Sequence, residues 1–141
     1  HFYSGGTAPS AFNRRTVAAL RDAGFDVTET GTEAKRGSAK TLNPKLRIEW
    51  GEGLETIEFS KRFSDESNPS KGFAALMVCS EADAECPTVP GAALRLSTPY
   101  LDPKAYDGSA FESAKYNERR DDIGRMMLAA ICQVRRELNA E

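Results

Sequence analysis

The chain has 141 residues, of which 40% are hydrophobic and 28% charged, and its formal net charge is -2. This length can bury a core without a disulfide scaffold and fits one domain spanning residues 1–141. Short Lys/Arg pairs form no basic face, which argues against a nucleic-acid binder. No apolar stretch approaches the roughly 20 residues that span a bilayer. Three cysteines without a secreted pattern predict a cytoplasmic protein with reduced thiols.

The first helix is predicted from Asn13 to Gly24. Asn13 can accept hydrogen bonds from the free amides of the first turn, and glycine suits the left-handed conformation that ends many helices. Val17 and Leu20 share one face. Alternating residues from Phe25 to Thr30 then predict a strand.

A hairpin is predicted over residues 46–63. Its two arms are joined by Gly-Glu-Gly at residues 51–53. Apolar residues recur in a period of two on both arms: Leu46, Ile48 and Trp50, then Ile57, Phe59 and Phe63. This alternation predicts an antiparallel pair with a single buried face.

The run "FAALMVC" at residues 73–79 is apolar at every position. A strand buried on both faces has this pattern, and such strands belong to parallel sheets covered by helices on both sides. A short strand follows at Ala93–Ser97, and the longest helix is predicted from about Ala110 to Leu138. Together these elements predict an α/β fold.

The long helix has a predicted core stripe and a predicted outer face. The stripe, at three-and-four spacing, is Ile123, Met127, Ile131, Val134 and Leu138. The outer face is Glu118, Arg119, Arg120, Asp121 and Arg125.

Ligands of open α/β sheets bind beyond the carboxyl ends of the strands. Three loops are candidates for that edge: residues 4–7, residues 79–86 and residues 100–108.

Cys79 and Cys86 are separated by six residues. Zinc needs about four ligands, usually including a closely spaced cysteine pair, and His1 is the single histidine, so a metal site is not expected. A dithiol relay is one interpretation, although the acidic loop between the cysteines would raise a thiol pKa. Spacing alone favours a buried Cys79 and an idle Cys86. Cys132, on the long helix, is expected in the core.

Two further loops carry candidate groups. Asp102 directly precedes Pro103 and could act as a general acid over a pocket. Asp102-Pro103, like Asp107-Gly108, is also an ordinary turn sequence, and in isolation the turn interpretation is the stronger one. Ser4 begins "SGGT", which lacks the residues of a nucleotide loop. That segment is either a turn or a support for a neighbouring loop.

A cysteine phosphatase carries Cys-x5-Arg, but none of the three cysteines has arginine six positions later. The chain nevertheless resembles the low-molecular-weight protein tyrosine phosphatase superfamily, including its arsenate-reductase branch, along nearly its whole length. The segment after the family's first helix resembles "FYSGGTAPSAFNRRTVAALRDAGFDV". The cysteine-bearing strand and loop of thioredoxin-coupled arsenate reductases resemble "FAALMVCSEADAECP". The family's general-acid loop resembles "PYLDPKAYDG", and its closing helix resembles "YNERRDDIGRMM". The hairpin resembles an elaboration found in a bacterial sub-branch.

The resemblance implies a three-layer sandwich around a mainly parallel sheet, with the hairpin inserted. It implies that Asp102 is the general acid, that Cys79 and Cys86 are the second and third members of a redox relay, and that Ser4 supports the phosphate loop. No cofactor is expected. The implied partners are a phosphate or arsenate oxyanion, a phosphotyrosine protein, and a thioredoxin-like reductant for the reductase variant.

The family's first strand, nucleophile loop and first helix have no counterpart in this sequence. The resemblance therefore implies an N-terminally incomplete domain that is inactive alone. The intact protein would be a phosphatase, an arsenate reductase or both. The alternative is a non-catalytic, phosphatase-like module that binds an oxyanion or a partner chain.

Overall fold

The computed structural model describes residues 1–38, 40–78 and 88–140. The helices and strands are α1 (Arg14–Asp22), β1 (Asp26–Glu33), β2 (Pro44–Gly51), β3 (Leu54–Glu58), β4 (Phe73–Met77), β5 (Ala92–Ser97), the 3-10 helix η1 (Pro103–Tyr106) and α3 (Glu112–Leu138). The mixed α/β class is therefore confirmed. Among the described residues, no helix combines the length and hydropathy that crossing a membrane requires.

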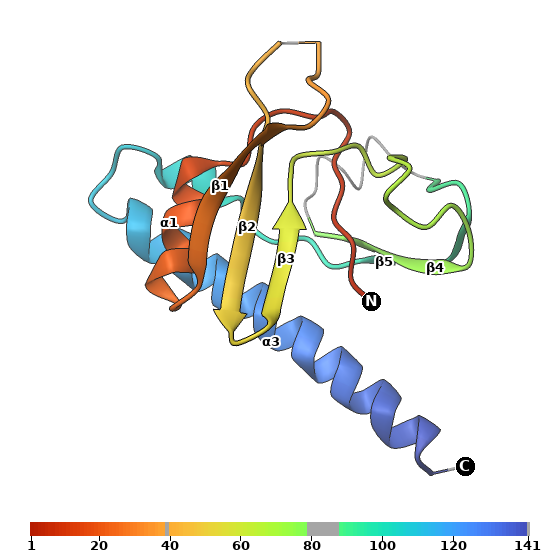
Figure 1. Ribbon diagram of the computed structural model, residues 1–141. Coiled ribbons are helices and arrows are strands. Elements are labelled where there is room, and N and C mark those ends of the chain that lie inside the picture. The colour runs from red at the N-terminus through yellow and green to blue at the C-terminus, as the bar shows by residue number, and fades with distance from the viewer. Residues whose placement is uncertain (39, 79–87, 141) are drawn as a thin grey trace.

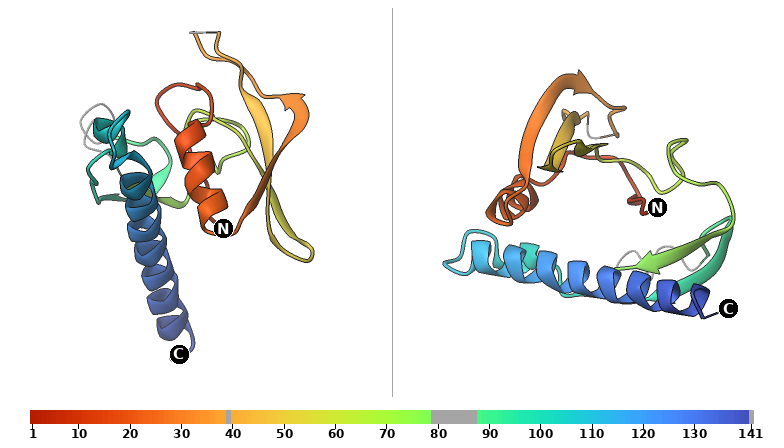
Figure 2. Two further views of the ribbon diagram at one scale, coloured as in Figure 1. Left: turned by 90° about the vertical axis from the view of Figure 1, so that its left-hand side faces the viewer. Right: turned by 60° about the horizontal axis from the view of Figure 1, so that its bottom comes forward.

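Helix α1 begins and ends as the local chemistry predicts. The Asn13 side chain accepts a hydrogen bond from the Arg15 amide at 2.9 Å, which satisfies one free donor of the first turn. Gly24 follows the helix with φ of 91°, a conformation that glycine adopts without steric cost. The chain then turns directly into β1, so α1 lies between the sheet and the first half of α3 (Figure 2).

Strands β1, β2 and β3 form an antiparallel sheet in that order (Figure 1). Its core is Val27 of β1 with Leu46 and Ile48 of β2. Half-buried side chains from α1 and its flanks pack against this core: Phe12, Val17, Leu20 and Phe25. The main apolar cluster of the described residues therefore joins α1 to one face of β1 and β2.

The hairpin is confirmed, but its single apolar face is not. Leu46 lies opposite Glu58 and Ile48 opposite Thr56, which puts Ile57 opposite Arg47 on the other face. The register shifts between Glu49 and Gly51, so the alternation of the first arm does not continue in phase on the second. Ile57 is consequently exposed.

Strands β4 and β5 pair in parallel and form a separate two-stranded sheet. The prediction that residues 73–79 are buried on both faces is wrong for the described part. Ala75 is buried, Ala74 is exposed, and the partner residues Leu94 and Leu96 on β5 are exposed as well. Parallel pairing of this strand is confirmed, but the predicted mainly parallel sheet is not, because the larger sheet of the described residues is antiparallel.

Helix α3 matches its predicted range to within two residues, but most of its predicted core stripe is exposed. Ile131, Val134 and Leu138 are 46%, 51% and 68% exposed. Figure 1 and the left view of Figure 2 show why, since the last turns of α3 extend beyond the strands. Tyr116, near the start of the helix, is its buried residue.

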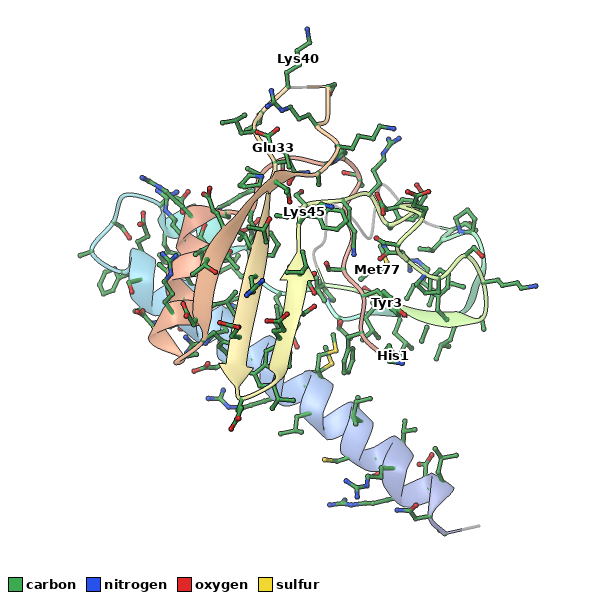
Figure 3. The ribbon with its side chains drawn as sticks, viewed as in Figure 1. His1, Tyr3, Glu33, Lys40, Lys45 and Met77 are labelled. Atoms are coloured by element: carbon green, nitrogen blue, oxygen red, sulfur yellow. The ribbon has the colours of Figure 1, made fainter. Side chains whose placement is uncertain are left out.

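Asn43 is a polar residue within the fold and is 0% exposed. Its side-chain amide donates to the carbonyls of Lys35 and Ser60, and its side-chain oxygen accepts from the Ser60 amide. These bonds tie the loop before β2 to the segment after β3. Lys40, in the same loop, projects away from the body (Figure 3).

Candidate functional site

A cavity of about 460 Å³ lies between α1, η1 and α3. Its walls include Ala19, Leu20 and Ile123, and its polar lining residues are Asn13, Thr16, Asp102, Tyr116, Arg119 and Arg120. Among the predicted site residues, Asp102 is the one that the described structure brings to this cavity. An apolar wall combined with a few polar groups is typical of a small-molecule site.

Asp102 is the N-cap of η1. Its Oδ1 accepts a hydrogen bond from the Lys104 amide at 2.9 Å, and its Oδ2 lies 3.5 Å from the Lys104 ammonium group. Pro103 occupies the first turn of η1, where a missing amide proton costs nothing. The carboxyl side chain is 49% exposed, so a ligand in the cavity mouth can reach it. Both the turn role and access to a pocket are therefore present at this residue.

Arg119 and Arg120 face the body, so their predicted place on the outer face is wrong. Arg119 donates from Nε to the Leu101 carbonyl at 3.0 Å, pairs with Asp122 and lies over the Tyr100 ring. This contact holds the chain directly before Asp102 against α3.

Arg120 reaches the opposite wall of the cavity. It donates a hydrogen bond to the Ala19 carbonyl of α1 and pairs with Asp121 at 2.7 Å. The two arginines thus connect α3 to η1 and to α1. A ligand anion would meet guanidinium groups that already have protein partners.

A polar network fixes the loop after η1. Arg15 lies 3.2 Å from Oδ2 of Asp107 and 2.8 Å from Oε2 of Glu112. The Tyr116 hydroxyl donates to Asp107 Oδ1 at 3.0 Å and accepts from the side-chain Nδ2 of Asn13 at 3.2 Å. Desolvation, followed by the bond to Asp107, raises the pKa of Tyr116 above its usual value. This network joins the starts of α1 and α3 to the loop that begins with Asp102.

Glu112 gives this network a dependence on pH. The Gly108 amide, at 2.6 Å, and then Arg15 lower the pKa of its carboxyl below the usual value. A carboxylate with a lowered folded-state pKa stabilises the fold above its unfolded pKa and loses that contribution as pH falls through the folded pKa. Glu112→Gln should therefore flatten the decline of thermal stability from about pH 6 to about pH 3.

Thermal unfolding followed by circular dichroism at several pH values measures this slope. Asp65, whose pKa is lowered by its hydrogen bonds with Ser67, should preserve part of the slope in the variant. Glu52→Gln, in the exposed hairpin turn, is the matched control for removing one surface carboxylate outside this network. Equal slopes for Glu112→Gln and the parent would contradict the assignment.

Ser4 is exposed, and its backbone carbonyl oxygen accepts a hydrogen bond from the side-chain Nδ2 of Asn68 at 3.0 Å. It is not among the residues that line the cavity. Figure 3 shows its neighbour Tyr3 on the N-terminal segment, on the side of β3 away from α1. The described residues therefore do not bring Ser4 and Asp102 into one site.

Cys132 is the one cysteine among the described residues. Cys79 and Cys86 lie outside the described residues, and the relay stays a prediction. Cys132 is exposed, so its predicted place in the core is wrong. Within the described ranges, no group of three or more His, Cys, Asp or Glu side chains could hold a metal ion.

Sequence reasoning missed the roles of Tyr116, Arg119 and Arg120. Tyr116 lies three residues before Arg119 and four residues before Arg120, and Ile123 continues the same helix face. The spacing of these residues therefore indicates a face of α3 that packs inward, but the prediction assigned its charged residues to the outer face.

No family model, curated protein or solved structure matches the chain.

Proposed function

We propose that this chain supplies the general-acid loop and the two-cysteine relay of an enzyme resembling low-molecular-weight tyrosine phosphatases and arsenate reductases. The observation that carries the proposal is the position of Asp102, at the start of η1 and at the mouth of a cavity with Arg119 and Arg120 in its walls. A catalytic acid requires this kind of access to a leaving group.

The proposal requires a nucleophile loop from another stretch of polypeptide, because the 141 residues contain no Cys-x5-Arg. It also includes the finer fold, a three-layer sandwich whose mainly parallel sheet is completed by a further strand. In the described ranges, β3 pairs only with β2 and β4 only with β5, so each has an unpaired edge. Unpaired edges are where additional strands bind.

In the phosphatase reaction, the cysteine thiolate outside this chain attacks phosphorus and the bond to the leaving oxygen breaks. Asp102 gives that oxygen its proton, and water then hydrolyses the thiophosphate. In the arsenate reaction, the same thiolate attacks arsenic, an arsenic–oxygen bond breaks, the oxygen leaves as water after protonation, and a thiol–arsenic adduct remains. Cys79 attacks the adduct sulfur, so a disulfide forms, two electrons pass to arsenic and arsenite leaves.

Cys86 then attacks the sulfur of Cys79 by thiol exchange, so a Cys79–Cys86 disulfide forms and the nucleophilic cysteine leaves as a thiolate. A thioredoxin-like reductant returns this pair to thiols. Neither reaction needs a further cofactor. Proteins with phosphotyrosine and the free oxyanions remain the proposed partners.

A second candidate function is a non-catalytic module. It is favoured by the cap and ion-pair partners that already engage Asp102 and the arginines. It also fits the unpaired sheet edges, which suit a partner chain. In this case the cavity binds an oxyanion weakly and catalyses nothing.

The test compares the 141-residue chain with a fusion that carries a strand, a Cys-x5-Arg loop and a helix upstream. The chain alone should not hydrolyse an aryl phosphate, whereas the fusion should hydrolyse it and reduce arsenate with a thioredoxin system. Cys86→Ser should remove arsenate turnover and spare hydrolysis, and the exposed Cys132→Ser is its control. Unchanged arsenate turnover in Cys86→Ser would refute the relay, and a well-folded but inactive fusion would favour the non-catalytic module.

A further inference from the structure

The chain exposes far more surface than a folded protein of its mass. Its accessible surface is 9897 Å² for 15.4 kDa. Folded monomers of this mass expose about 7,200 Å², so the excess is about 2,700 Å². A stable interface buries about 800 Å² on each partner. The excess is therefore large enough for a stable interface.

Part of the exposed surface is an apolar face along α3. A groove of about 640 Å³ is lined by Phe2, Phe25, Trp50, Met127, Leu128 and Ile131. Along α3 beyond the groove, Val134 and Leu138 continue the same helix face and are more than half exposed. We call this groove and the two following side chains the α3 face.

The second half of α3 has little support within one chain. Every residue from 131 to 140 is exposed, and Figure 3 shows side chains standing out from these turns with no other element beside them. Most helix stability in proteins comes from packing of an apolar face, because isolated short helices are marginal in water. A 27-residue helix with an uncovered apolar end thus indicates a missing partner.

We propose that a second copy of this chain covers the α3 face, with the two α3 helices antiparallel. Met127 and Ile131, in the groove, are four residues apart, as are Val134 and Leu138 beyond it. An antiparallel pair with its two-fold axis between residues 132 and 133 places Met127 against Leu138 of the partner subunit and Ile131 against the partner's Val134. Each groove then receives the end of the other helix, which gives the self-complementary contact of a two-fold dimer.

Charge selects this direction over the parallel one. Arg135 follows Val134 and lies at the edge of the apolar stripe, whereas Arg136 lies on the opposite side of the helix. A parallel pair would bring Arg135 level with the partner's Arg135, and like charges repel. The antiparallel pair brings Arg135 level with the partner's Ala130, which is uncharged. This inference does not depend on the proposed enzyme function.

Sedimentation and light scattering of the purified 141-residue chain over a range of micromolar concentrations test the dimer. We expect a species of twice 15.4 kDa. The double variant Ile131→Glu/Val134→Glu should be monomeric and still folded, with a circular dichroism loss no larger than the helicity of the last turns of α3, because both side chains are exposed in the single chain. Leu42→Glu is a matched control, since Leu42 is 58% exposed and lies outside the α3 face. A monomeric parent, or a double variant that remains dimeric, would overturn the proposal.

Helix direction is tested by a spin-label distance. A label on Ala114→Cys, with the three native cysteines changed to serine, marks the exposed side of α3 near its start. At 1.5 Å per residue, the antiparallel pair separates the two labelled backbones by about 55 Å. A parallel pair would keep them within about 25 Å, since α-helices pack roughly 10 Å apart. The shorter distance would refute the antiparallel arrangement.

Discussion

Asp102→Asn should lower kcat for hydrolysis of a phenyl phosphate by about 10²- to 10⁴-fold in the fusion that carries a Cys-x5-Arg loop. The phenolate that leaves is basic and needs a proton in the transition state, and asparagine cannot supply one. Asparagine is, however, as good an N-cap as aspartate. The Lys104 amide therefore keeps an acceptor, and η1 should still form.

Two comparisons separate acid catalysis from damage to the loop. With p-nitrophenyl phosphate, whose leaving group needs little protonation, the loss in Asp102→Asn should be much smaller. Asp102→Ala removes the acid and the cap together, and should in addition destabilise the protein by about 1 kcal/mol. Equal losses with both substrates would contradict the role of Asp102 as the general acid.

Arsenate provides an independent readout of the same variant. Its reduction proceeds through sulfur–arsenic and sulfur–sulfur bonds, which do not use the carboxyl group of Asp102 in the proposed sequence. Asp102→Asn should therefore retain most arsenate turnover and lose phosphatase activity, which is the reverse of the outcome for Cys86→Ser. A variant of either residue that loses both activities would argue for a structural role.

The elements that were predicted well depend on local chemistry. Asn13 and Gly24 specify the ends of α1 through contacts within a few residues, and those ends are correct. The Gly-Glu-Gly turn likewise specifies a hairpin. The shift between Glu49 and Gly51 could not be inferred from alternation, because a single extra residue reverses the faces of everything beyond it.

The burial of α3 shows a second limit of prediction from sequence patterns. A three-and-four stripe shows that a helix has an apolar face, but not which part of that face has a partner. Ile123 contributes to the cavity wall beside α1, while Ile131 and Leu138 on the same stripe are exposed. Burial follows from where neighbouring elements end, and that information is not local.

The candidate site also combines a residue that local sequence indicates with contacts that it does not. Asp102 could be selected because Asp-Pro and the surrounding loop have a recognisable pattern. The spacing on α3 could also indicate the face with Tyr116 and Arg120, but not its partners, since Asn13 and Tyr116 are 103 residues apart and Arg120 meets Ala19 across 101 residues. Contacts of this kind require the packing of α1 on α3, which sequence patterning alone does not place.

Asn43→Ala should destabilise the chain by at least about 3 kcal/mol, because it leaves the Ser60 amide and the carbonyls of Lys35 and Ser60 without their bonds. The whole free energy of unfolding of such a domain is about 5–15 kcal/mol. Urea unfolding followed by circular dichroism measures the loss. Asn139→Ala, at the exposed end of α3, should change stability by less than about 0.5 kcal/mol.

Asn43→Asp distinguishes loss of hydrogen bonds from loss of volume. The carboxylate keeps an acceptor for the Ser60 amide, but it turns an acceptor toward two carbonyl oxygens that need a donor. At neutral pH this variant should therefore be at least as unstable as Asn43→Ala, although it is nearly isosteric with the parent. Burial raises the pKa of a carboxyl group, and the protonated acid regains one donor. Its deficit relative to the parent should accordingly shrink as pH falls from the raised folded-state pKa toward the usual aspartate value of about 3.9. A nearly native stability of Asn43→Asp at neutral pH would show that the side chain fills space and that its two donated bonds contribute little.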